Sequence, residues 1–184
     1  MKTILFLMLA LAGFTAQAAD YSVLQPQQSS IAFLSRQMGV PMEGHFARFN
    51  AAVSVDPAQP EKGTARIDIE TASIDVGSQE AYDEVIGKSW FDTAKFPQAS
   101  FVSSQVTRIA PGRYEVAGRM TIRDVTREIR APFTLEQKGN QLMVAGVLPI
   151  KRLEYGIGSG MWGDTDTIAD EVQIRFRLTF AAGK

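Results

Sequence analysis

The stretch that decides the fold is residues 112–138, GRYEVAGRMTIRDVTREIRAPFTLEQK. Residues 114–122 alternate strictly between apolar and polar side chains, and the alternation resumes over residues 125–135. Strict alternation is typical of a strand with one dry face and one wet face. Two such strands joined only by Arg123-Asp124 predict an antiparallel hairpin. The turn is weak for its type, because these turns favour residues that tolerate positive φ, which arginine does less readily than aspartate.

A lone hairpin is marginal in water, so other parts of the chain must cover its dry face. The same alternation predicts further strands at residues 30–38, 42–55, 65–69, 100–109, 141–150 and 171–180. Within residues 42–55 the apolar positions change phase, which predicts a bulge near Ala47-Arg48. Ser78 is predicted to cap the one convincing helix, residues 79–86.

These elements predict an all-β fold with one short helix. Alternation, in place of continuous apolar runs, favours antiparallel strands with one wet face. A sheet of about eight strands leaves open edges unless it closes on itself, so we expect an extended eight-stranded antiparallel barrel with an apolar inside. The helix and the aromatic residues Trp90, Phe91 and Phe96 are expected to cap one end. A two-sheet sandwich is the alternative.

The N-terminus resembles a bacterial secretory signal peptide. Lys2 precedes an apolar run, and Ala16-Gln17-Ala18 is a small-x-small cleavage site. We therefore expect a signal peptide at residues 1–18, cleaved after Ala18, and a single periplasmic domain at residues 19–184. The apolar run is short for a transmembrane anchor, which is the alternative. The chain has no cysteine, which excludes disulfides, thiolate metal sites and lipid anchoring through cysteine. Its net charge of −1 argues against a nucleic-acid-binding surface.

The barrel interior is the predicted binding site, because an eight-stranded barrel is either just filled or holds one small ligand. Gly44, Gly118 and Gly146 fall on the apolar phase of three strands. Each of them either leaves the lumen partly empty or marks a bend or close strand crossing, and the sequence does not decide between these. An empty, dry lumen of this length would suit a slender apolar chain. The expected lining is Phe33, Met38, Phe46, Phe101, Met120, Phe133 and Leu148.

Two arginines are unexpected near an apolar interior. Arg127 falls on the inward phase close to the hairpin turn, and Arg152 follows the strand at residues 141–150. Each either meets a polar head group at the barrel mouth or forms a salt bridge on the rim, and the salt bridge is favoured because arginine is usually exposed or paired. The predicted ligand-binding residues are Phe33, Met38, Gly44, Phe46, Phe101, Gly118, Met120, Arg127, Phe133, Gly146, Leu148, Arg152 and Trp162.

Ordered motifs along the chain resemble those of the YceI family of secreted, lipocalin-like bacterial proteins. They are Ser29-x-Ile31-x-Phe33, Gly44-x-Phe46-x-x-Phe49, Ser73-Ile74-Asp75-x-Gly77, Trp90-Phe91-Asp92-x-x-x-Phe96-Pro97-x-Ala99-x-Phe101, Gly118-x-Met120-Thr121-Ile122-Arg123-x-Val125-Thr126-Arg127 and Arg152-x-x-Tyr155-Gly156-Ile157-Gly158. The resemblance implies an extended eight-stranded barrel with a helix at one end. It also implies a long internal pocket for polyisoprenoids or similar amphiphiles such as quinones, and a homodimer in some members.

The expected function is that of a periplasmic carrier for a long isoprenoid-type lipid, such as a quinone or quinone precursor. The alternative is a non-enzymatic partner or stress-response protein of a membrane redox or envelope system, with a filled barrel and an exposed apolar patch. No catalytic constellation is found: His45 is the only histidine, and Asp164, Asp166, Asp170 and Glu171 lack the spacing of an EF-hand. We expect no metal, no cofactor other than a bound lipid, and transient contact with membranes or membrane redox proteins.

Overall fold

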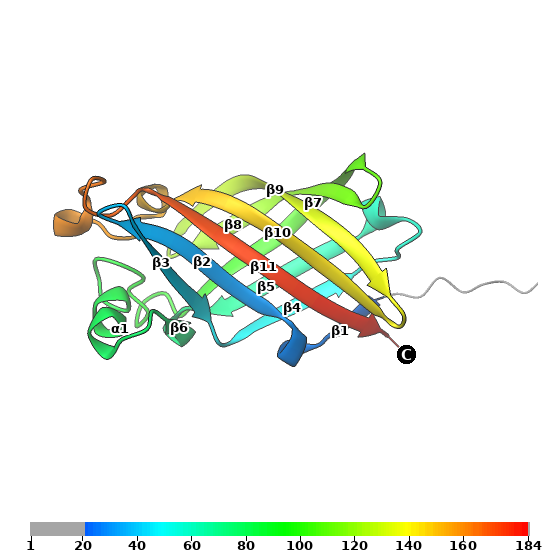
Figure 1. Ribbon diagram of the computed structural model, residues 1–184, viewed down its shortest axis with the longest axis horizontal. Helices are drawn as coiled ribbons and strands as arrows, with labels where there is room; N and C mark the ends of the chain where they lie inside the picture. The colour runs from blue at the N-terminus through cyan, green and yellow to red at the C-terminus, as the bar shows by residue number, and fades with distance from the viewer. Residues whose placement is uncertain (1–20, 184) are drawn as a thin grey trace, which may run out of the picture.

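The computed structural model describes residues 21–183, so the predicted signal peptide lies outside the described residues. The chain forms an elongated, curled antiparallel sheet with one short helix at one end (Figure 1). The predicted fold class, a lipocalin-like antiparallel barrel capped by a helix, is confirmed. None of the helices within residues 21–183 is long and apolar enough to cross a membrane.

Eleven strands are ordered β4-β5-β7-β8-β9-β10-β11-β2-β3-β6, with β1 beside β11. They are β1 (Tyr21–Leu24), β2 (Ser30–Gln37), β3 (Val40–Phe46), β4 (Phe49–Ser54), β5 (Thr64–Glu70), β6 (Ile74–Asp75), β7 (Gln98–Ala110), β8 (Arg113–Ile122), β9 (Val125–Lys138), β10 (Gln141–Lys151) and β11 (Glu171–Ala182). The helix α1 spans Gln79–Val85, and the Ser78 hydroxyl caps it by accepting from the Ala81 amide at 3.2 Å. Short 3₁₀ turns are η1 (Pro26–Gln28), η2 (Pro60–Lys62), η3 (Thr71–Ser73), η4 (Arg152–Tyr155) and η5 (Gly160–Trp162).

The strand count differs from the eight predicted because three strands of the barrel are interrupted. The single strand expected at residues 42–55 is two strands: it breaks at Ala47-Arg48, where β3, paired with β2, gives way to β4, paired with β5. In the same way, η1 separates β1 from β2, which both pair with β11. The turn η3 separates β5 from β6. Counting these three interrupted pairs once each, with β7 to β11, gives eight. Each interruption is a place where the strand bends to follow the curled wall.

The predicted hairpin is confirmed as β8 and β9, with Ile122 facing Val125 across the turn. Arg123 takes the positive φ, at 58°. Its guanidinium donates to the carbonyl oxygens of Trp90 and Gly156, which lie in the segments that cover this end of the barrel. The unfavourable backbone of Arg123 is therefore held by contacts that no turn rule includes.

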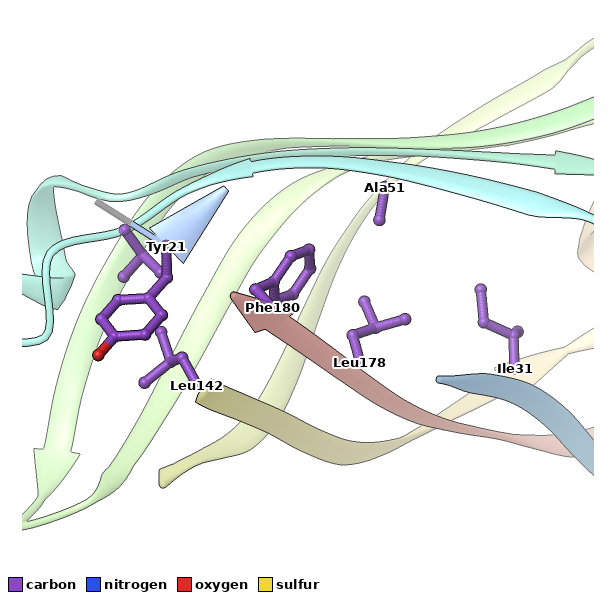
Figure 2. Packing of buried hydrophobic residues seen from close by; sticks show 7 residues of the cluster. Tyr21, Ile31, Ala51, Leu142, Leu178 and Phe180 are labelled. Atoms are coloured by element: carbon purple, nitrogen blue, oxygen red, sulfur yellow. The ribbon is translucent and has the colours of Figure 1, made fainter. Parts of the chain in front are cut away.

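Both ends of the barrel are filled by side chains. Figure 2 shows Tyr21, Leu142 and Phe180 gathered from β1, β10 and β11 at the end near the C-terminus, and all three are buried. The Gln137 side-chain amide donates to the Tyr21 hydroxyl at 2.8 Å and so satisfies its polar tip. At the opposite end, α1 and the aromatic segment after it lie against the barrel, as predicted, with Phe46 and Phe91 rings in edge contact 6.0 Å apart.

The three glycines on the dry face leave room for phenylalanine rings of neighbouring strands. Phe33 lies over Gly44 and Phe176 over Gly146, each pair facing across a strand ladder. Phe101 also lies over Gly118, but diagonally, because Gly118 faces Ser103 in the ladder. The structure thus decides between the two interpretations of these residues: they mark close approach of a neighbouring strand's ring, and they do not leave the lumen empty.

We predict that Gly118→Ala destabilises the barrel. A Cβ atom there would lie 2.4 Å from the Val102 carbonyl oxygen and 2.6 Å from the Phe101 ring, so backbone and ring must both shift. Overpacking of this kind costs about 1–3 kcal/mol in the free energy of unfolding. Urea titration monitored by circular dichroism measures the free energy of unfolding. Arg119→Ala, exposed on the same strand, is the control and should change the value by less than about 0.5 kcal/mol. Equal stability of the two variants would refute the close packing.

Candidate functional site in the barrel lumen

Two apolar cavities lie inside the barrel. The first, of about 150 Å³, lies toward β1 and is lined by residues such as Val53, Phe133 and Leu178; we call it the β1-end cavity. The second, of about 140 Å³, lies toward α1 and is lined by residues such as Phe33, Phe46 and Phe91; we call it the helix-end cavity. Both walls are almost wholly apolar. Each cavity has room for several water molecules but offers them almost no polar partner, so both favour an apolar occupant.

The two cavities adjoin at a waist, because six side chains line both of them. These are Ile31, Ile67, Ile69, Phe101, Met120 and Ile174. They come from five strands around the barrel, so a ligand that passes the waist would contact the wall on several sides. The two cavities therefore adjoin inside the barrel and together form a dry, apolar lumen.

The predicted lining residues divide by position. Phe33 and Phe46 line the helix-end cavity, Phe133 and Leu148 line the β1-end cavity, and Phe101 and Met120 form part of the waist. Sequence analysis did not single out the isoleucines of the waist. Their inward phase was visible in the alternation of β5 and β11, but nothing in the pattern showed how far along the barrel they lie.

Met38 does not line the lumen, and that prediction is wrong. It lies in the turn between β2 and β3 with φ of 48°, and its side chain is 70% exposed. Val40 and Met42, which follow it, are also exposed. Met38 is also out of phase with Ile31 and Phe33, the lining residues of β2, and it lies beyond the end of that strand at Gln37.

Arg152 lines the helix-end cavity, but its guanidinium is neither a rim salt bridge nor free to meet a head group, because loop carbonyl oxygens take its donors. The residue is 1% exposed. Its guanidinium has five N–H donors, and its three nitrogens donate to five backbone carbonyl oxygens. These belong to Ala169 (3.1 Å), Ile157 (2.9 Å), Gly158 (2.7 Å), Trp162 (2.8 Å) and Ile168 (2.8 Å). All of them lie in the segment between η4 and β11, which has little regular structure of its own. Arg152 therefore holds together the loop that covers this end of the barrel.

The same arginine anchors a pair of tryptophans. Its guanidinium lies over the Trp90 ring, 5.7 Å from the ring centre, and Trp90 packs against Trp162 at 5.9 Å. The Trp162 indole N–H donates to a Glu84 carboxylate oxygen of α1 at 2.7 Å. Trp162 thus links loop and helix on the outside of the helix-end cavity, and it does not line either cavity. Burial lowers the pKa of Arg152, and the Asp170 carboxylate partly offsets this.

Arg127 lies outside the lumen, as the favoured rim interpretation predicted. Its Nε donates to the Glu154 carbonyl oxygen at 3.1 Å and lies 3.6 Å from a Glu154 carboxylate oxygen. It also borders a surface depression of about 570 Å³, which we call the polar hollow. The hollow is lined by Thr126, Arg127, Glu128, Ile129, Pro149, Ile150, Lys151, Glu154, Tyr155 and Glu171.

The carboxylates that follow η5 support the loop. Asp164 accepts from the Asp166 amide at 3.0 Å and from the Thr167 hydroxyl at 2.7 Å, and these bonds lower the pKa of Asp164. Asp170 accepts from the Leu153 amide at 3.0 Å. Within residues 21–183 no three His, Cys, Asp or Glu side chains gather in a way that could hold a metal ion.

Comparison with known proteins gives consistent matches. A family model described as the YceI-like domain matches residues 23–180. A UPF0312 protein of Yersinia pestis is 35% identical over 142 residues, which are 74% of this chain and 71% of that protein. The crystal structure of Burkholderia cenocepacia BcnA is 42% identical, with a TM-score of 0.83 over 85% of this chain and 98% of that one. A polyisoprenoid binding domain from Saccharophagus degradans shares the fold at 19% identity, with a TM-score of 0.70 over 90% of this chain and 99% of that one.

We predict that Arg152→Lys destabilises the protein severely although it keeps the charge. A lysine ammonium has three donors and no planar fork, so at least two buried carbonyl oxygens would lose their partner. Unpaired buried polar groups cost about 1–3 kcal/mol each, so the free energy of unfolding should fall by about 3 kcal/mol or more.

The matched control is Arg127→Lys, because its half-exposed ion pair should contribute less than about 1 kcal/mol. Chemical denaturation monitored by tryptophan fluorescence measures the free energy of unfolding of both variants. The signal is suitable because Trp90 and Trp162 lie beside Arg152. If the two substitutions cost the same, Arg152 does not hold the loop as described.

Proposed function

This chain belongs to the YceI-like domain family, and from that membership and its dry lumen we propose that it binds a long isoprenoid-type lipid. The cargo would be a quinone, a quinone precursor or a similar amphiphile, carried with no chemical change. The observation that carries the proposal is the pair of adjoining apolar cavities along the barrel axis. The proposed role is non-enzymatic and needs no cofactor.

The physical support is the match between the lumen and a hydrocarbon chain. Each methylene transferred from water to an apolar wall contributes about 0.8 kcal/mol, so a chain of many carbons gains affinity without polar contacts. The six apolar side chains of the waist would give a hydrocarbon chain apolar contact from one cavity to the other. The polyisoprenoid binding domain of Saccharophagus degradans has the same fold, which is in keeping with this ligand class.

A second candidate function is docking to a partner protein, and one observation favours it. Met38, Val40 and Met42 present exposed apolar side chains at the β2–β3 turn. An exposed apolar patch is the feature expected of a partner or stress-response protein of a membrane redox or envelope system. Such a protein would also be expected to have a filled barrel, so the two cavities favour the lipid-binding proposal.

We propose a periplasmic location, because residues 1–18 resemble a bacterial signal peptide. In that location the carrier would exchange its lipid with membranes or membrane redox proteins through transient contacts. A homodimer is compatible with the proposal, and nucleic acid is not among the proposed partners, since the net charge is −1.

Blocking the β1-end cavity tests the proposal. Val53 lines this cavity from β4, so Val53→Phe should fill it and lower the affinity for a long prenyl quinone at least tenfold. The adjacent Ala52 is exposed on the opposite face of β4, and Ala52→Phe should leave the affinity unchanged. Fluorescence quenching by the quinone gives the affinity, and circular dichroism confirms folding of both variants. Equal affinities for the two variants would place the ligand outside the lumen.

A further inference from the structure

The barrel wall is split where β9 and β10 stop pairing. The ladder between them runs from Gln141–Lys138 to Gly146–Phe133 and ends there. Beyond that point residues 125–132 of β9 keep their pairing with β8, and residues 147–151 of β10 keep theirs with β11. Within the described residues, no ladder crosses between these two stretches, which we call the seam.

Two prolines explain why the ladder ends. Pro132 lies next to Phe133, the last residue of β9 that pairs with β10. Pro149 lies in the part of β10 that does not pair with β9. Proline has no N–H to donate, so in a sheet its nitrogen faces an unpaired side. The Pro132 carbonyl oxygen does point toward β10, since a Cβ atom at Gly146 would lie 2.4 Å from it. Pro132 remains aligned with Glu115 of β8, and Pro149 with Gln173 of β11. Both missing donors therefore belong to the seam.

At the seam, the polar hollow shares lining residues with both cavities. Ile129 of β9 lines both the polar hollow and the β1-end cavity. Ile150 of β10 lines both the polar hollow and the helix-end cavity. These two side chains thus separate the hollow from the dry interior. The ends of the barrel are blocked by Tyr21, Leu142 and Phe180 on one side and by the Arg152 loop and α1 on the other.

We propose that the ligand passes through the seam sideways, between Ile129 and Ile150, and leaves its polar head in the hollow. The proposal rests on the proposed lipid-binding function and adds the route and the head-group position. No ladder pairing spans the seam, so opening it leaves the β8–β9 and β10–β11 ladders intact. Arg127 joins the two sides at the hollow through its half-exposed contact with Glu154, which costs little to separate, and through its position over the Tyr155 ring, 5.8 Å from the ring centre.

The hollow suits an uncharged, hydrogen-bonding head group. Its cations Arg127 and Lys151 are opposed by the carboxylates of Glu128, Glu154 and Glu171, so it offers no excess positive charge to a phosphate. Tyr155 also lines it, and none of the described residues hydrogen-bonds the Tyr155 hydroxyl. Burial raises the pKa of Tyr155, so this hydroxyl stays neutral and can donate to an alcohol or carbonyl oxygen.

Cross-linking the seam tests the route. The chain has no cysteine, so Ile129→Cys/Ile150→Cys can be closed after folding with a short bifunctional maleimide. The control pair is Thr134→Cys/Ala145→Cys, which faces across the intact part of the same ladder. The probe is a fluorescent long-chain prenyl alcohol, and stopped-flow mixing gives its association and dissociation rates before and after cross-linking.

Closure of the seam should slow the association and dissociation rates at least tenfold. Protein that is loaded before closure should retain its probe. Closure of the control pair should change neither rate. Unchanged rates in the closed seam would overturn the route and leave lipid binding intact. Absence of binding in every form, open or closed, would overturn the lipid-binding function and the route together. A pyrophosphate head on the same chain should bind no more tightly than the alcohol, and a tenfold gain would overturn the head-group assignment.

Discussion

One buried guanidinium holds the end of the barrel that strands alone leave open. Arg152 donates to five carbonyl oxygens of a loop that has only a short 3₁₀ turn of its own. Those carbonyl groups would otherwise be buried without partners, at a cost of about 1–3 kcal/mol each. Because the loop is ordered, Trp90 and Trp162 can pack together, and α1 is tied to them through Glu84. The dry helix-end cavity depends on this arrangement.

Closing both ends of a barrel raises the question of how its interior is reached. The wall is continuous where ladders pair, and close ring-on-glycine packing such as Phe33 over Gly44 makes it dense. Pairing is interrupted between β9 and β10, where prolines remove ladder donors. Covered ends together with an unpaired stretch of wall would let the proposed carrier confine a lipid and still release it. The seam and the polar hollow lie side by side because Ile129 and Ile150 border both.

Much of the fold could be predicted from the sequence because local patterns determine it. The alternation of residues 112–138 gave the β8–β9 hairpin, and Ser78 gave the start of α1. What could not be predicted depends on which strands are neighbours and on depth along the barrel. Period two shows that Arg127 shares a phase with Ile129 and Phe133, which line the lumen, but it does not show that Arg127 lies beyond the lumen.

The same limit applies to the glycines and prolines. Gly118 was visible on the dry face, yet only the three-dimensional arrangement brings the Phe101 ring over it. Pro132 and Pro149 were visible too, yet the seam follows only once β9 and β10 are known to be adjacent. Arg152 was the largest surprise, because a fully satisfied buried arginine needs carbonyl groups from a loop whose path no pattern indicates.

The central claim is that the lumen holds a lipid, and native mass spectrometry of the protein purified from a bacterial periplasm tests it most directly. The account predicts a discrete added mass that solvent extraction releases as a prenyl chain or quinone. A bare protein that stays bare after incubation with long prenyl alcohols and quinones would contradict it.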